Sequence, residues 1–263
     1  MMLTPVTMKL DLQKELTDAL NIEEVFSFKI GNFTVNIDET TVVSWIIIVA
    51  MSLIAFLLTR NLKVEGEITR RQALLELAYE KAFGFFHGLI GEKGDRYVPW
   101  LMSTCLFIGI SNMIGLLGFK PPTKSMQITA AMALTSIVIV EYAAFKERGV
   151  KGRLKAFTKP IWIVTPINVM EIFTKPLSLA MRLFGKVLAA FTIMELLKIV
   201  TRAVYIPALP AVFSLYFDLF DGLLQAYIFV FLTGLYIKES VEIEEEEPKK
   251  KRKKQKKIKY KKA

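Results

Sequence analysis

The chain has 263 residues, of which 53% are hydrophobic and 23% charged, and its 35 Lys and Arg outnumber its 25 Asp and Glu to give a formal net charge of +10. These values exclude an ordinary soluble domain, because so many apolar and charged residues coexist only when the two kinds are segregated along the chain. One cysteine and one histidine exclude an internal disulfide and a Cys or His metal cluster, so we expect neither a metal nor a cofactor.

The N-terminal residues are expected to form a segment outside the membrane. Residues 1–40 contain seven Asp or Glu and three Lys. The first 20 residues lack a basic stretch followed by an apolar core, so a cleaved signal peptide is not expected. The first membrane span would then serve as the targeting signal.

Apolar stretches long enough to cross about 30 Å of hydrocarbon follow this segment. We predict five of them, near 41–59, 97–119, 128–145, 166–200 and 206–238. Each is expected to be a helix, because a helix satisfies its own backbone hydrogen bonds in lipid. Charged and apolar residues alternate at helical spacing over 64–90, which predicts a helix along the membrane interface. The predicted fold class is an all-α integral membrane protein with a membrane domain over 41–240.

The distribution of basic residues predicts the orientation. Seven Lys or Arg lie in 60–96 and six in the loop 146–159, whereas the alternate loops contain few. Because basic loops remain in the cytoplasm, the N-terminus is predicted outside and the C-terminus inside. Residues 241–263 change from acidic to basic at Pro248, which predicts a disordered cytoplasmic tail attracted to anionic lipid. The basic run holds a single aromatic residue, so nucleic acid is not an expected partner.

Ionisable residues occupy one face of the fourth predicted span. The intervals between them are four, seven and four residues, for Glu171, Lys175, Arg182 and Lys186. Arg182 stands near the middle, where a charge costs about 2.5–3.5 kcal/mol and usually faces a water-filled path or a partner charge. Lys186 has a structural alternative too, because a buried lysine, unlike an arginine, can become neutral. Small residues beside these charges permit close packing or the approach of a partner helix; they are Ala180, Gly185, Ala189 and Ala190.

The last predicted span carries a second polar stripe. Its members, spaced by four, three and four residues, are Ser214, Asp218, Asp221 and Gln225. A hydrated ion path explains the two aspartates, and capping or pairing with a lysine is the alternative. Either aspartate would also be the partner of Arg182 if that arginine were only structural. Both spans exceed the hydrocarbon thickness, so we expect a long, strongly tilted hairpin with a kink near Pro176.

Three segments give the chain a resemblance to a known family. KPLSLAMRLFG (175–185), LLQAYIFVFLTGLYI (223–237) and SNMIGLLGFKPPT (111–123) together resemble the a subunit of F-type ATP synthases, over roughly 40–238. The resemblance implies a non-catalytic subunit of a bacterial-type inner (plasma) membrane. Its two aqueous half-channels would load and unload the carboxylates of a rotating c-ring. The implied partners are the c-ring, the stator b subunits, other ATP synthase subunits, the lipid bilayer and the transported H⁺ or Na⁺.

The resemblance also implies roles for individual residues. Arg182 matches the family's essential arginine, which separates the half-channels, and Gln225 matches the glutamine that faces it from the last helix. Asp218 occupies a position in the exterior half-channel, and Glu171 a position toward the other one. Further matched residues belong to the loop after the second span or flank the arginine: Asn112, Gly115, Pro122, Thr123, Ser178 and Gly185.

The chain departs from the family pattern at several positions. Lys186 stands where the family usually has Asn, and residues 190–191 are Ala-Phe where many members have Gly-Glu. Asp221 is the expected replacement for the missing carboxylate. Ser125 and Gln127 stand where Asp and Asn are usual.

Two other classes of membrane protein place charges at mid-membrane. A secondary transporter usually contains inverted repeats and broken helices in both halves, and the sequence shows neither. A membrane-protein insertase combines few spans, an arginine in a groove and a basic tail, but is not expected to carry an acidic stripe before Gln225.

Overall fold

The computed structural model describes residues 24–30, 33–63, 69–117, 119–157, 163, 165–204 and 212–242. Most of the predicted exterior segment and all but two residues of the predicted tail lie outside the described residues. The two exceptions in the tail, residues 241 and 242, end the last helix.

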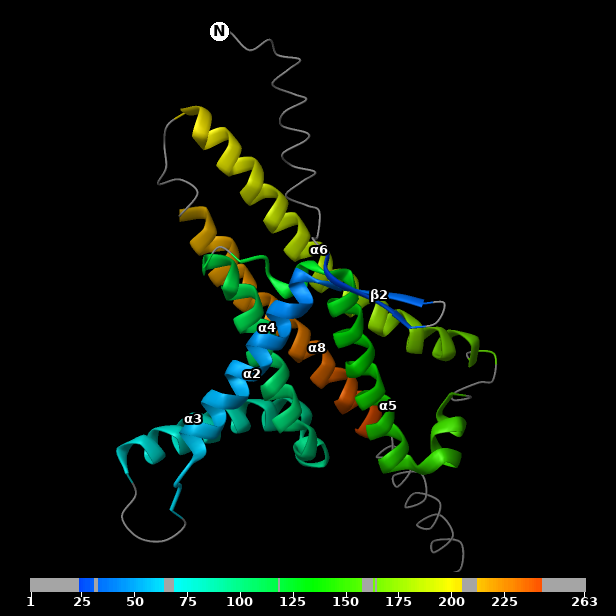
Figure 1. Cartoon of the computed structure of the whole chain (residues 1–263). Helices are drawn as coiled ribbons and strands as arrows, with labels where there is room; N and C mark the ends of the chain where they lie inside the picture. Colours follow the sequence, from blue (N-terminus) through cyan, green and yellow to red (C-terminus); the bar gives the residue numbers. More distant parts are fainter. Residues whose placement is uncertain are drawn as a thin grey trace, which may run out of the picture.

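The described elements follow one another in this order: strands β1 (Glu24–Ile30) and β2 (Phe33–Asp38), helices α2 (Glu39–Thr59) and α3 (Arg70–Ile90), the 3₁₀ turn η1 (Glu92–Tyr97), helix α4 (Val98–Met113), the 3₁₀ turns η2 (Ile114–Leu117) and η3 (Pro122–Lys124), helices α5 (Met126–Phe157) and α6 (Thr165–Val204), the π-helical segment η5 (Leu215–Asp221) and helix α8 (Gly222–Glu242). Figure 1 shows their arrangement.

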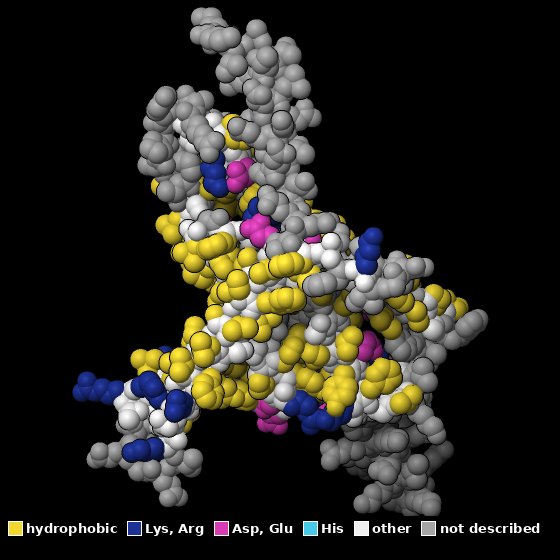
Figure 2. Space-filling model, viewed as in Figure 1, with side chains coloured by type: hydrophobic (Ala, Val, Ile, Leu, Met, Phe, Trp, Pro, Cys, Tyr) yellow, Lys and Arg dark blue, Asp and Glu magenta, His cyan; other side chains and the backbone are white. Residues whose placement is uncertain are grey.

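Five helical segments of the described chain are long and apolar enough to cross a membrane. They are Glu39–Thr59, Glu92–Leu117, Met126–Val150, Thr165–Ile199 and Val212–Val241. Each coincides with one of the five predicted spans within a few residues, which confirms the predicted all-α, multi-pass membrane protein. Figure 2 shows a broad hydrophobic band over this region, as expected for a surface that faces lipid.

A short β-hairpin precedes the first span, and we did not predict it. β1 and β2 pair antiparallel, with Ile30 opposite Phe33. The two strands are separated by Gly31 and Asn32, a dipeptide typical of tight hairpin turns. The Gly-Asn dipeptide is therefore a hairpin signal in the sequence, which the acidic composition of this segment does not reveal.

Helix α3 covers most of the segment for which an interfacial helix was predicted, and a glutamine joins it to the chain just after α2. The Gln72 side chain accepts a hydrogen bond from the Lys63 backbone N–H (3.1 Å) and donates one to the Lys63 carbonyl (2.7 Å). Gln72 is buried although most of α3 is exposed. Figure 1 shows α3 lying across the lower end of α2.

The basic segment predicted as a loop over 146–159 is helical as far as Phe157, which corrects that expectation. A turn at Gly149 with φ +66° interrupts α5, and glycine adopts this backbone conformation without a Cβ clash. Beyond the turn Arg153 donates two hydrogen bonds to the Glu141 carboxylate, at 2.6 and 3.1 Å. The ion pair holds the end of α5 back against its own span.

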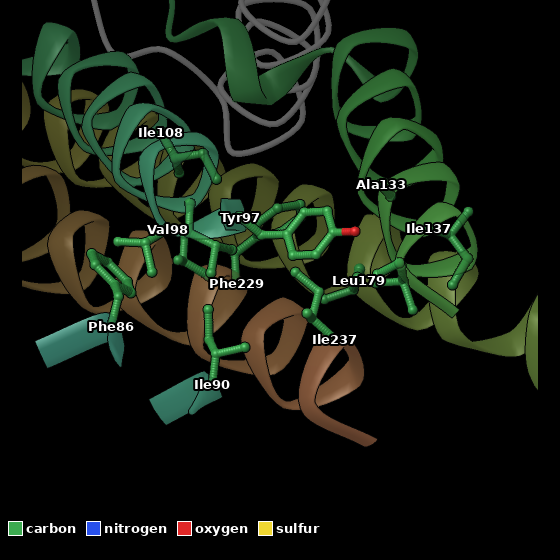
Figure 3. Close-up of a cluster of buried hydrophobic side chains, with 14 of the residues drawn as sticks. Phe86, Ile90, Tyr97, Val98, Ile108, Ala133, Ile137, Leu179, Phe229 and Ile237 are labelled. Carbon is green, nitrogen blue, oxygen red and sulfur yellow. The ribbon is translucent and has the colours of Figure 1, made fainter. Parts of the chain in front are cut away.

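The buried core lies between α4, α5 and α8. Figure 3 shows Val98 of α4, Ile137 of α5 and Phe229 of α8 together with Leu179 of α6. α6 packs mainly against α5, whereas α8 packs against α4 and α5 and has only limited contact with α6. α4 and α5 therefore form a scaffold that positions the two long charged helices with space between them.

Pro176 lies inside α6 and is buried. Figure 1 shows α6 changing direction between its first turns and its long remainder, which agrees with the predicted kink at this proline.

Candidate functional site

A cavity of about 420 Å³ lies between α6, the α8 end of the chain and the loop that follows α4. α6 contributes residues between Lys186 and Lys198, and the opposite wall comes from η5 and the start of α8. The loop from Gly115 to Pro121 covers one side. The cavity is therefore bordered by three segments that are far apart in the sequence.

All four residues of the second predicted polar stripe line this cavity: Ser214, Asp218, Asp221 and Gln225. The segment that carries the two aspartates is a π-helix, a detail that the predicted helical span did not specify. A π-helical turn contains an additional residue and often occurs at functional sites. Asp218 and Asp221 both line the cavity from this segment.

The Asp218 side chain lies between the Ser214 hydroxyl and the backbone of Gly115. The Ser214 Oγ donates a hydrogen bond to Asp218 Oδ2 over 2.5 Å. A Cβ placed on Gly115 would stand 3.0 Å from Asp218 Oδ1. Glycine at position 115 therefore lets the loop after α4 pass beside the carboxylate.

Asn112 joins this loop to the last helix. Its Nδ2 donates a hydrogen bond to the Gly222 carbonyl at 2.9 Å, and its Oδ1 accepts one from the Thr123 hydroxyl at 2.6 Å. Asn112, Pro122 and Thr123 are buried, so the loss of either bond would leave a polar group unpaired where water does not reach easily. The predicted loop residues thus lie in one cluster beside the cavity.

Each lysine that lines the cavity has a carboxylate partner. Lys186 Nζ lies 3.7 Å from Asp221 Oδ1, and Lys198 Nζ lies 2.8 Å from Glu195 Oε1. Lys120 Nζ lies 3.0 Å from Glu39 Oε2. Within the described ranges, Asp218 is then the one lining carboxylate without a Lys or Arg nitrogen within 4.0 Å.

Arg182 does not line the cavity, and it has no carboxylate partner within the part of the chain that the structure describes. It is partly buried, and its Nη2 reaches the Ser178 hydroxyl at 3.5 Å. The two carboxylates considered as structural partners are engaged elsewhere, Asp218 by Ser214 and Asp221 by Lys186. The structural ion pair is therefore not formed.

Gln225 is 1% exposed, and neither its Oε1 nor its Nε2 has a hydrogen-bond partner among the described residues. The structure does not join it to Arg182, although the family resemblance implies that the two face each other. A buried amide with both polar atoms unpaired is costly. Gln225 is thus available to a water molecule or to a group from outside the chain.

Glu171 lies apart from the cavity, in a separate charged cluster. Lys175 Nζ lies 3.4 Å from Glu171 Oε2 and 3.1 Å from Glu239 Oε2, and it stands 5.1 Å from the centre of the Tyr236 ring. Glu239, near the end of α8, is a residue that we did not select from the sequence. Only its position opposite Lys175 in the folded chain brings it into the cluster.

The small residues near Arg182 differ in exposure. Ala180 is buried in the core and Ala190 lines the cavity, whereas Gly185 and Ala189 are exposed. A Cβ on Gly185 would meet nothing within 4 Å. This face of α6, which also exposes Ser178, is therefore not needed for packing inside the described chain.

Lys124 is a further cation that we did not select from the sequence. It is 2% exposed, and its Nζ lies 3.7 Å from the centre of the Phe191 ring. Burial, assisted by the charge of Lys120, lowers the pKa of Lys124 from its ordinary 10.5 to about 8. The pattern of charges in the sequence gave no sign that this lysine would be enclosed.

Comparison with known proteins identifies the family. The model of the ATP synthase A chain family matches residues 41–238. ATP synthase subunit a of Moorella thermoacetica is 32% identical over 223 residues, which are 84% of this chain and 98% of the relative. ATP synthase subunit a 1 of Chlorobaculum parvum is 30% identical over 227 residues, 86% of this chain and 97% of the relative. The chain belongs to the ATP synthase A chain family and is a non-catalytic, multi-pass membrane subunit of the F0 sector.

Proposed function

We propose that the chain forms two aqueous half-channels that load and unload the carboxylates of a rotor c-ring, and that Arg182 separates them. The cavity beside Asp218 belongs to the exterior half-channel. The cluster of Glu171, Lys175 and Glu239 belongs to the cytoplasmic one. The transported ion is H⁺ or Na⁺.

The observation that carries this proposal is the state of Arg182. Its guanidinium lies well inside a membrane-spanning helix without a carboxylate partner in the described chain. Arginine stays protonated in proteins, and a charge at this depth usually faces a polar path or an opposite charge. A carboxylate supplied by a neighbouring subunit would be the opposite charge that Arg182 does not have within the described chain.

The chemistry follows from charge. An ion that passes Asp218 would bind a rotor carboxylate and travel with the ring until it reaches the cytoplasmic half-channel. The positive charge of Arg182 favours the ionised form of a nearby rotor carboxylate, by about 1–3 pKa units, and so promotes release of the ion. The same charge repels cations that would cross directly between the half-channels. One charge crossing 100 mV yields about 2.3 kcal/mol, so several ions must pass for each ATP.

The surfaces of the molecule support the remaining partners and the orientation. The exposed face of α6 around Gly185 offers close approach to a ring helix. Figure 2 shows Lys and Arg gathered at the end of the molecule formed by α3, and the positive-inside rule makes that end cytoplasmic. We place the N-terminus outside, the C-terminus in the cytoplasm and the protein in a bacterial-type plasma membrane. Stator b subunits are the further expected neighbours.

The test compares Arg182→Ala with Arg70→Ala, which removes an exposed arginine from α3, in vesicles containing the whole ATP synthase. We expect Arg182→Ala to abolish ATP-driven ion pumping while ATP hydrolysis continues, and Arg70→Ala to change neither. Acridine-dye quenching and ²²Na⁺ uptake would identify the ion. Normal pumping by assembled Arg182→Ala complexes would refute the proposal.

A further inference from the structure

We infer that Lys186 and Asp221 act as one charge-neutral unit in the wall of the exterior cavity, with Asp221 serving as the counter-charge of Lys186 and Asp218 alone carrying the ion. This inference rests on the proposed function, because it takes the cavity to be the path of the translocated cation. In this arrangement Lys186 and Asp221 do not carry the ion; each compensates the charge of the other.

The first support is the geometry of the pair. Lys186 comes from α6 and Asp221 from η5, so the contact crosses the cavity between its two main walls. The Nζ to Oδ1 distance of 3.7 Å is longer than the roughly 2.7–2.9 Å of a charge-assisted hydrogen bond. Both side chains are partly exposed, at 43% and 30%. The contact is therefore a loose Coulomb pair at a water-accessible surface.

The second support is the balance of charge around the cavity. The other two lining lysines also have carboxylate partners. Lys198 pairs with Glu195, one turn earlier in α6, and Lys120 pairs with Glu39 at the start of α2. Together with Glu39, which lies outside the lining, these pairs cancel one another, and Asp218 is the lining carboxylate that no described lysine pairs with. Loss of the Asp221 charge would leave Lys186 as an uncompensated positive charge in the wall, which lowers the local concentration of cations.

The third support is position. Lys186 follows Arg182 by four residues, and Asp221 precedes Gln225 by four residues, so the pair lies one helical turn from each. An uncompensated Lys186 would therefore place a second fixed positive charge where an ion must pass toward Arg182. Asp221 is the one described carboxylate within ion-pair distance of Lys186. Its negative charge cancels this repulsion.

The experiment measures ATP synthesis by the whole complex in vesicles as the exterior concentration of the transported ion is varied. Asp221→Asn is expected to raise the half-maximal ion concentration about tenfold with little change in maximal rate, because repulsion lowers the local ion concentration. Lys186→Asn is expected to shift it in the opposite direction. The double variant, Lys186→Asn with Asp221→Asn, should return it to within about twofold of wild type, as cancellation of paired charges requires.

Asp218→Asn is the reference for loss of an ion carrier, and it should lower the maximal rate whether or not Lys186→Asn is added. The inference is overturned if Asp221→Asn leaves the half-maximal concentration unchanged, if the double variant stays as impaired as Asp221→Asn, or if Lys186→Asn acts in the same direction as Asp221→Asn. Failure of the proposed function would appear differently, as normal pumping by Arg182→Ala and normal synthesis by Asp218→Asn.

Discussion

Asp218 and Gly115 lie so close that the carboxylate occupies space which any larger residue at position 115 would need. A Cβ at Gly115 would stand 3.0 Å from Asp218 Oδ1 and 3.1 Å from its Cγ. The opposite oxygen of the carboxylate accepts the hydrogen bond from Ser214. The loop after α4 and the hydroxyl on the last membrane segment therefore hold Asp218 from two sides.

Gly115→Ala should displace Asp218 and weaken its bond to Ser214, because a contact of 3.0 Å is tighter than an ordinary one. We expect ion-driven ATP synthesis to fall several-fold while the amount of assembled complex stays normal. The control is Gly88→Ala in α3, where an added Cβ would meet nothing within 4 Å. Equal synthesis rates in the two variants would show that Asp218 tolerates the methyl group.

Gly185→Leu tests the exposed face of α6. Because nothing in the described chain lies within 4 Å of a Cβ at this position, the variant should insert and fold normally. If the face lies against the rotor, the larger side chain should block close helix approach and strongly reduce ATP-driven pumping. Pumping and cross-linking to the c-ring should fall together, and pumping at the wild-type rate would place the rotor elsewhere.

The buried Lys124 predicts a dependence of stability on pH. Its pKa is about 8 in the folded chain and 10.5 ordinarily, so between these values the unfolded chain binds more protons. Stability therefore rises with pH over this interval, and below about pH 8 the full cost of burying the charge is present. The two pKa values correspond to a cost of about 3 kcal/mol at most.

Lys124→Met should remove this cost and retain a favourable contact with the Phe191 ring. The variant chain should leave the purified complex at a higher temperature than wild type at pH 7, and the difference should shrink between about pH 8 and pH 10.5. Lys93→Met, which changes an exposed lysine, is the control. If the difference in dissociation temperature between Lys124→Met and wild type stays constant across this pH interval, the lowered pKa assigned to Lys124 is wrong.

The five spans could be predicted because the hydropathy of a span is a sum over neighbouring residues. Hydropathy over about 20 residues determines whether a helix can cross the membrane, and the five predicted stretches agree with the five observed ones. The three segments 111–123, 175–185 and 223–237 together also pointed to the family that the comparison identifies. The hairpin before the first span was missed although Gly31 and Asn32 carried a turn signal.

Several features of the site depend on contacts between segments distant in the sequence. The stripe pattern identified Lys186, Asp218 and Asp221 as candidates, but left open whether the aspartates would carry an ion or pair with a basic residue. In the folded chain Asp221 pairs with Lys186, while Asp218 accepts a hydrogen bond from Ser214. A difference of a few ångströms decides such pairings, and spacing along one helix does not contain that information.

The sequence by itself determined that the chain crosses the membrane five times and carries an arginine and two aspartates inside it, because hydropathy and residue order are properties of single segments. The tertiary structure decided the π-helical turn of η5, the burial of Lys124 and the absence of a described carboxylate beside Arg182. These features depend on how α4, α5, α6 and α8 pack. Close packing sets the distances between charges, and Coulomb and hydrogen-bond energies depend on those distances.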